Sequence, residues 1–145
     1  PLLAKEKHTQ WSPDLIYFNN REVKPTTGYC VQKLYGQNAG SHYIPSQIIL
    51  DNQDNRVKLR IGSSIVRDSK TGDVIVKLVN LLPVSVETEI QLPGIGSVQP
   101  SAVRTVLAGA PESTPLPVTD TIEVGVNFKQ QLPAYSFTVI RLKTK

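Results

Sequence analysis

Two glutamates, Glu87 and Glu89, have the spacing that comes nearest to a catalytic pair of carboxylates. At positions i and i+2 of a strand they would share one face, with Cα atoms roughly 6.5–7 Å apart. That is close to the roughly 6.5–9.5 Å between the carboxyl groups of an inverting glycosidase. Residues 84–90 alternate, however, so that Val86 and its even-numbered neighbours face inward and both glutamates face solvent. We therefore interpret the pair as the polar face of a strand and predict no catalytic residue in this chain.

The other residue types that carry chemistry lack partners at suitable spacings. His8 and His42 have no histidine or cysteine partner at a metal-ligand spacing, so we predict no metal site from them. Cys30 is the single cysteine, which excludes an internal disulfide, and its place on the apolar side of a predicted helix indicates a buried thiol. Ser63 and Ser64 have no adjacent histidine that could activate a nucleophile.

The composition is that of a globular domain. The chain has 145 residues, of which 39% are hydrophobic and 19% charged, and this balance argues against a disordered chain. No apolar run approaches the roughly 18 residues of a membrane-spanning helix. The formal net charge of +4 is spread along the chain rather than gathered in a basic block. We therefore expect neither a membrane nor a nucleic acid as a partner.

The first residue is Pro1, and the sequence contains no methionine. Because a complete gene product begins with methionine, we expect a processed chain or a piece of a longer protein. Its compartment would be that of the longer protein: periplasmic or extracellular if that protein is secreted, and cytoplasmic otherwise.

Residues 1–40 have the pattern of a helix, a strand and a second helix. Residues 1–4 resemble the end of a helix whose beginning is missing, followed by basic residues typical of a helix C-terminus. Residues 14–18 form an apolar run after one charge, which indicates a strand buried on both faces, as in a parallel sheet. Residues 29–35 carry a helical apolar stripe, and Thr26 or Thr27 is a candidate N-cap.

Residues 41–145 change to short alternating segments separated by turn residues, which is typical of a β-sandwich or a β-barrel. Glycine and aspartate around residues 68–72 predict a hairpin turn. In the last segment Tyr135, Phe137 and Val139 are expected to form the inward row. The predicted strands cover residues 46–50, 59–67, 73–80, 84–90, 102–107, 121–126 and 135–142.

A lone strand buried on both faces raises a physical problem, because it needs neighbours that residues 1–40 do not encode. The strand formed by Leu15, Ile16, Tyr17 and Phe18 must be covered by the sandwich, by a second copy of the chain, or by a preceding part of a longer protein. An uncovered apolar strand also invites pairing, so a homodimer through residues 15–18 is one expected outcome.

Two segments of the first part carry a specific resemblance. Residues 11–20 read W-S-P-D-L-I-Y-F-N-N and residues 29–35 read Y-C-V-Q-K-L-Y. They resemble the C-terminal region of the α-L-arabinofuranosidases of glycoside hydrolase family 51, which has an aromatic residue where Cys30 stands. Residues 72–80 and 132–142 are also similar to that family, so the resemblance spans most of the chain.

The resemblance implies a mainly β fold: a jelly-roll-like antiparallel β-sandwich preceded by a helix–strand–helix remnant of a (β/α)8 barrel. Residues 1–40 would be the last β/α unit of a truncated catalytic barrel, and residues 41–145 the C-terminal sandwich domain. The family's two catalytic glutamates lie on the fourth and seventh barrel strands, both before residue 1, so none can be carried over. Asn19 and Asn20 follow the eighth strand and would lie at the substrate-facing rim.

The implied activity belongs to the longer protein. It would hydrolyse terminal non-reducing α-L-arabinofuranosyl residues of polysaccharides or oligosaccharides with retention, without a metal or organic cofactor. Its partners would be the missing barrel and, through it, an arabinose-containing substrate. This chain would be an accessory structural domain that is inactive alone. The alternative is a carbohydrate-binding module, against which the sequence argues weakly, because Phe128, Tyr135 and Phe137 are the only aromatic residues after residue 43.

Overall fold

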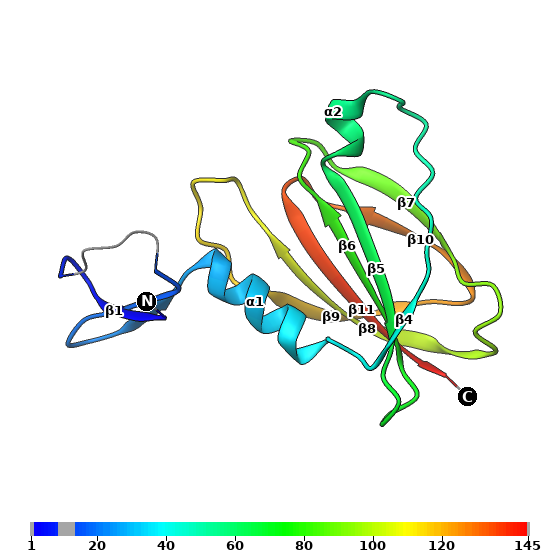
Figure 1. Ribbon diagram of the computed structural model, residues 1–145, viewed down its shortest axis with the longest axis horizontal. Coiled ribbons are helices and arrows are strands. Elements are labelled where there is room, and N and C mark those ends of the chain that lie inside the picture. The colour runs from blue at the N-terminus through cyan, green and yellow to red at the C-terminus, as the bar shows by residue number, and fades with distance from the viewer. Residues whose placement is uncertain (1, 9–13, 145) are drawn as a thin grey trace.

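The computed structural model describes residues 2–8 and 14–144. Three layers make up its main body: a helix, a six-stranded sheet and a two-stranded sheet (Figure 1). All strand pairs of these two sheets are antiparallel, which confirms the mainly β sandwich. The strands of these sheets are β4 (His42–Ile44), β5 (Ile61–Arg67), β6 (Val74–Asn80), β7 (Val86–Gln91), β8 (Val98–Ala108), β9 (Val118–Glu123), β10 (Asn127–Leu132) and β11 (Ser136–Thr144).

The six-stranded sheet has the order β4-β5-β6-β11-β8-β9 and is covered on both faces. Even-numbered residues of β6 and β11, among them Val76 and Ile140, point toward the two-stranded sheet β10-β7 and form one core with Leu132. Odd-numbered residues such as Ile75 and Phe137 form a second core beneath the helix. Phe137 and Val139 are therefore buried as predicted, but against the helix and not between the two sheets.

Helix α1 (Thr27–Gln37) begins where the sequence predicts. Thr26 is its N-cap, and the Thr26 hydroxyl accepts a hydrogen bond from the Tyr29 N–H at 3.3 Å. Cys30 and Leu34 are the buried residues of the helix and pack on the six-stranded sheet. The helix thus shares a core with the sandwich, although it lies before the boundary predicted at residue 40, and that boundary stays a prediction.

A small sheet of three short strands precedes α1: β1 (Leu3–Lys5), β2 (Ile16–Phe18) and β3 (Val23–Pro25). β2 lies between a parallel β1 and an antiparallel β3. The helix predicted at residues 1–4 is wrong, because residues 3–5 form a strand. A few residues cannot nucleate a helix alone, and here the Ile16 N–H donates to the Leu2 carbonyl oxygen at 3.0 Å.

The second part of the chain corrects further boundaries. The strand predicted at residues 46–50 is wrong, because the edge strand is β4 and residues 45–50 have no regular structure. A short helix, α2 (Asn55–Lys58), precedes β5. β10 was not predicted, because the inward-facing Gln130 interrupts the apolar row of that strand. The β5–β6 hairpin is confirmed, with Gly72 at a φ of 78° in its turn.

Candidate functional site

Asn19 and Asn20, the two predicted rim residues, follow β2 directly. The Asn19 Oδ1 atom accepts hydrogen bonds from the N–H groups of Arg21 at 2.9 Å and Glu22 at 3.0 Å, so the side chain closes the turn to β3. Its Nδ2 atom donates to Glu6 Oε2 at 3.0 Å. Asn20 is exposed. Asn19 is therefore occupied by its own turn, and substrate contact by either residue stays a prediction.

A small network of charges surrounds Asn19. Lys24 Nζ lies 3.2 Å from Glu6 Oε1 and 3.1 Å from Glu22 Oε1. Hydrogen bonds from Asn19 and then from Lys24 lower the pKa of Glu6, and hydrogen bonds to Glu22 and then Glu6 raise the pKa of Lys24. The Glu6 carboxylate is thus held ionised, as an acceptor only, and the network fastens the end of β1 to the β2–β3 turn. The segment that carries the resemblance also includes residues 11–13, among them Trp11, and these lie outside the described residues.

The candidate carboxylate pair lies on the solvent face of the two-stranded sheet. Glu87 is exposed and forms an ion pair with Lys129 on β10 at 3.0 Å. Glu89 is also exposed and accepts a hydrogen bond from Gln91 Nε2 at 2.8 Å. Val86 and Thr88 alternate with them and are partly buried. The interpretation of the pair as the polar face of a strand is confirmed.

Within residues 2–8 and 14–144 no group of three or more histidine, cysteine, aspartate or glutamate side chains could hold a metal ion. Cys30 is buried at 5% exposure in the core beneath α1. His42, at the start of the edge strand, contacts the Ser41 hydroxyl at 3.0 Å through Nδ1. The same hydroxyl donates to the Arg67 carbonyl oxygen at 3.2 Å and accepts from the Ser69 N–H at 2.8 Å, so this exposed serine–histidine contact is part of the local turn.

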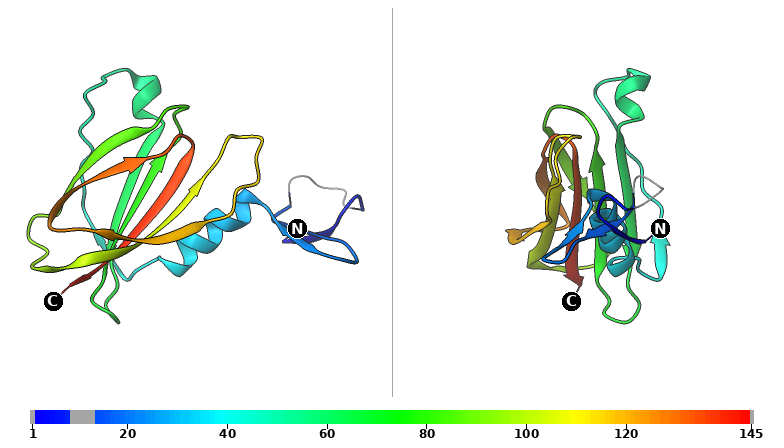
Figure 2. Two further views of the ribbon diagram at one scale, coloured as in Figure 1. Left: turned by 180° about the vertical axis from the view of Figure 1, so that it is seen from behind. Right: turned by 90° about the vertical axis from the view of Figure 1, so that its left-hand side faces the viewer.

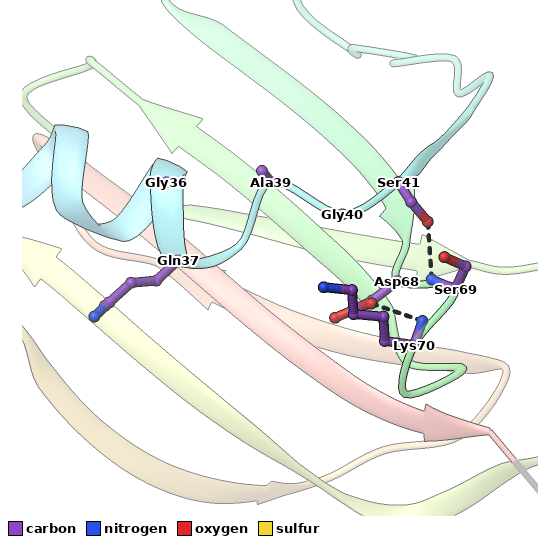
Figure 3. A pocket seen from close by; sticks show the side chains of 8 residues that line it. All are labelled: Gly36, Gln37, Ala39, Gly40, Ser41, Asp68, Ser69 and Lys70. Carbon is purple, nitrogen blue, oxygen red and sulfur yellow. Dashed lines mark hydrogen bonds between the residues drawn. The ribbon is translucent and has the colours of Figure 1, made fainter.

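A shallow polar depression lies between the end of α1 and the β5–β6 turn (Figure 3). The Ser41 hydroxyl accepts from the Ser69 N–H at 2.8 Å, and Asp68 Oδ1 accepts from the Lys70 N–H at 3.0 Å. The Lys70 backbone is the main cause of a lowered Asp68 pKa, with a smaller contribution from Arg141. These polar groups shape the hairpin turn itself, so the depression is explained by local folding.

The aromatic rings do not form a sugar-binding platform in the described residues. Tyr35 on α1 stacks on Phe137 with ring centroids 4.6 Å apart and planes 8° apart, but Phe137 is buried. Tyr43, on edge strand β4, is 65% exposed. A row of coplanar, exposed rings, which carbohydrate-binding sandwiches commonly use, is not seen among the rings described.

The chain was compared with known proteins. No protein-family model matches it. Over 47 residues, 32% of this chain, it is 49% identical to an "Extracellular exo-alpha-L-arabinofuranosidase" of Streptomyces chartreusis, of which the match covers 6%. In the described part of the chain, no helix is long and apolar enough to cross a membrane.

Solved structures give a match over the whole chain. The arabinose-bound MgGH51 α-L-arabinofuranosidase has a TM-score of 0.85 and 31% identity over all of this chain. An arabinose complex of the Thermotoga maritima α-L-arabinofuranosidase has a TM-score of 0.73 over 90% of the chain at 14% identity, which supports the fold alone.

This chain spans 23% of the first structure and 32% of the second. It is therefore about a quarter to a third as long as the enzymes it resembles. The chain is related over its whole length to the α-L-arabinofuranosidases of glycoside hydrolase family 51 and corresponds to their C-terminal region.

Proposed function

We propose that this chain is the accessory C-terminal part of an α-L-arabinofuranosidase, that it supports a catalytic barrel, and that it is not catalytic alone. One observation carries the proposal: the chain is 31% identical, over its whole length, to an arabinose-bound enzyme of family 51 that is about four times as long. Two of the described carboxylates add support, because each forms an ion pair with a lysine: Glu87 with Lys129, and Glu6 with Lys24.

The chemistry would reside in the longer protein. A retaining glycosidase uses one carboxylate as nucleophile to form a glycosyl-enzyme intermediate, and a second as general acid and then general base. Under our proposal both glutamates stand on barrel strands before residue 1, and the substrate is a terminal α-L-arabinofuranosyl residue. Asn20, whose side chain is exposed beyond β2, is the better of the two rim residues to approach that substrate.

The small sheet is the proposed contact with the barrel. It stands beyond the N-terminal end of α1, away from the sandwich (Figures 1 and 2). All three residues of β2 are half-buried, while Leu2, Leu3 and Val23 are more than half exposed. Parallel strand pairs such as β1 and β2 occur almost entirely in sheets covered on both faces. A barrel sheet continuing from β1 would bury these apolar side chains.

In the isolated chain the same surface would pair with a second copy. We expect light scattering after size exclusion to give a dimer that dissociates in the Leu3→Glu variant, because that substitution places a charge on an exposed apolar position. A wild-type chain that stays monomeric at high concentration contradicts the dimer but leaves the accessory role intact.

The function itself is tested by two assays on the same preparation. Hydrolysis of an aryl α-L-arabinofuranoside should be undetectable, and calorimetry with arabino-oligosaccharides should show no binding heat. Turnover by a clean preparation would overturn the proposal. Binding without hydrolysis would make the chain a carbohydrate-binding module, and Tyr43→Ala would then test the one largely exposed ring of the sandwich.

A further inference from the structure

Lys77 is a buried cation in the middle of β6. It is 4% exposed and points from the six-stranded sheet toward α1, between Ile75 and Val79 on the same face. Among the residues that the structure describes, its amino group forms no ion pair with a carboxylate. Burial lowers the pKa of Lys77, and an uncompensated buried charge is costly. Some other group must therefore stabilise it.

That group is the C-terminal end of α1. Lys77 Nζ donates a hydrogen bond of 2.7 Å to the main-chain carbonyl oxygen of Asn38, the residue that caps the helix. The same nitrogen lies 5.5 Å from the centroid of the Tyr35 ring, within range of a cation–π interaction. A helix C-terminus carries partial negative charge, and the last turn of α1 contains no basic residue of its own. The compensating cation comes from the sheet.

Asn38 joins the helix end to two strands. Its Nδ2 atom donates to the Leu34 carbonyl oxygen at 2.9 Å, which closes the last turn. Its Oδ1 atom accepts from Arg141 Nη2 on β11 at 3.4 Å. Arg141 is itself held by Asp73 at 2.9 Å and lies 3.6 Å from Asp68. The carboxylates near this cluster are thus engaged by Arg141, whereas Lys77 faces the helix end.

We propose that Lys77 is a positioning residue that locks the C-terminal end of α1 onto the sandwich and so fixes the direction in which α1 carries strands β1–β3. The inference rests on contacts within this chain and does not depend on the proposed function. Apolar packing by Cys30 and Leu34 holds the helix against the sheet, but packing of this kind is not directional. The hydrogen bond and the charge at one helix end supply the direction.

The competing possibility is that the charge of Lys77 is merely tolerated. In that case an apolar side chain of similar length would serve as well, because buried ionic groups can often be replaced by hydrophobic residues without loss. Lys77→Met separates the two possibilities, since it keeps the length and removes the charge and the donor. Lys77→Arg restores both, and Lys129→Met on exposed β10 is the matched control.

Hydrogen exchange of the α1 amides is the first readout. In Lys77→Met we expect these amides to exchange about tenfold faster, while those of β6, β8 and β11 stay within about twofold of wild type. Lys77→Arg should recover most of the protection, and Lys129→Met should match wild type. Wild-type protection of α1 in Lys77→Met would overturn the proposal.

The direction of the N-terminal strands is the second readout. Spin labels at Arg21→Cys, on the β2–β3 turn, and Glu89→Cys, on the outer face of β7, report the distance between the small sheet and the sandwich. We expect a broader distance distribution in Lys77→Met and recovery in Lys77→Arg. An unchanged distribution would overturn the positioning role.

A measurement on the wild-type chain keeps the proposal testable if Lys77→Met does not fold. Acetic anhydride acylates exposed amines, so Lys129 should react at once and Lys77 only when α1 detaches. Across a series of low urea concentrations, Lys77 acylation should follow exchange of the α1 amides. Two results would contradict the lock. One is acylation of Lys77 as fast as that of Lys129 without urea, and the other is acylation of Lys77 only when the whole chain unfolds.

Discussion

The side-chain amide of Asn80 donates a hydrogen bond of 2.8 Å to the main-chain carbonyl oxygen of Pro133, more than 50 residues further along the chain. Asn80 is completely buried at the end of β6. The same nitrogen donates to the Val84 carbonyl oxygen at 2.9 Å, and Asn80 Oδ1 accepts from the Leu82 N–H at 3.0 Å. One side chain thus holds together the β6–β7 loop and the β10–β11 loop.

Replacing Asn80 should therefore destabilise the sandwich severely. Asn80→Leu keeps the size but leaves main-chain carbonyl oxygens of both loops without a donor, and we expect a loss of about 2–4 kcal/mol in the free energy of unfolding. Urea unfolding followed by circular dichroism measures the change. Asn127→Leu, at an exposed position of β10, should stay within about 0.5 kcal/mol of wild type. Equal effects of the two substitutions would contradict this role.

The two glycines near the end of α1 should respond oppositely to alanine. Gly40 has a φ of 69°, and a Cβ there would lie 2.6 Å from Val66 Cγ2, so Gly40→Ala should cost about 1–3 kcal/mol. Gly36 has open space around it inside the helix, so Gly36→Ala should gain about 0.5–1 kcal/mol. Thermal unfolding of both variants checks the signs, and a stabilising Gly40→Ala would refute the predicted close approach.

Leu34 tests whether α1 is part of the sandwich core. Leu34 is 7% exposed and packs beneath the helix with Leu107 and Val139, so Leu34→Ala should destabilise the whole sandwich by about 2–4 kcal/mol. Leu59, which is 84% exposed, is the matched control, and Leu59→Ala should change stability by less than about 0.5 kcal/mol. A Leu34→Ala variant as stable as Leu59→Ala would contradict this packing.

The ion pair between Arg104 and Asp120 joins β8 to edge strand β9 and should make stability fall in acid. The hydrogen bond from Arg104 is the main cause of the lowered pKa of Asp120. Because that pKa is lower in the folded chain than in the unfolded one, the pair stabilises the fold above the ordinary aspartate value of about 3.9. The contribution is then lost as the pH falls through the lower folded value.

Asp120→Asn removes this dependence. We expect wild type to have the higher urea midpoint at pH 7, and the difference between the two proteins to shrink at pH 3. Asp51→Asn, on an exposed loop, is the control and should follow wild type at both pH values. A difference that grew toward pH 3 would have the wrong sign for a lowered pKa.

Strands with clear alternation or a strong apolar run were predictable from the sequence. β5, β6 and β11 lie close to their predicted bounds, and the Thr26 cap of α1 is confirmed. β1, β3 and β4 were missed because strands of three residues are too short for a period to show. The apolar run at residues 48–50 misled the prediction, since Ile49 is 84% exposed.

The buried polar residues were harder to anticipate. Lys77 stands in a run of otherwise apolar residues in β6, and such a run is the signal that both faces of the strand are covered. The sequence therefore indicates that both faces of β6 are covered. The group that compensates the charge of Lys77, the carbonyl oxygen of Asn38, lies 39 residues away in the chain and is positioned by tertiary packing. For Asn19 the local turn was foreseeable, whereas its contact with Glu6 was not.

The place of β11 between β6 and β8 has a consequence for vectorial synthesis on the ribosome. A nascent chain that has emerged only through residue 135 holds β4-β5-β6 and β8-β9 as two separate half-sheets, each with an open inner edge. Neither core can form completely, because Ile140 belongs to the core between the two sheets and Phe137 belongs to the core beneath α1. The sandwich must therefore fold late, and until β11 arrives these edges are the surfaces that a chaperone would have to shield.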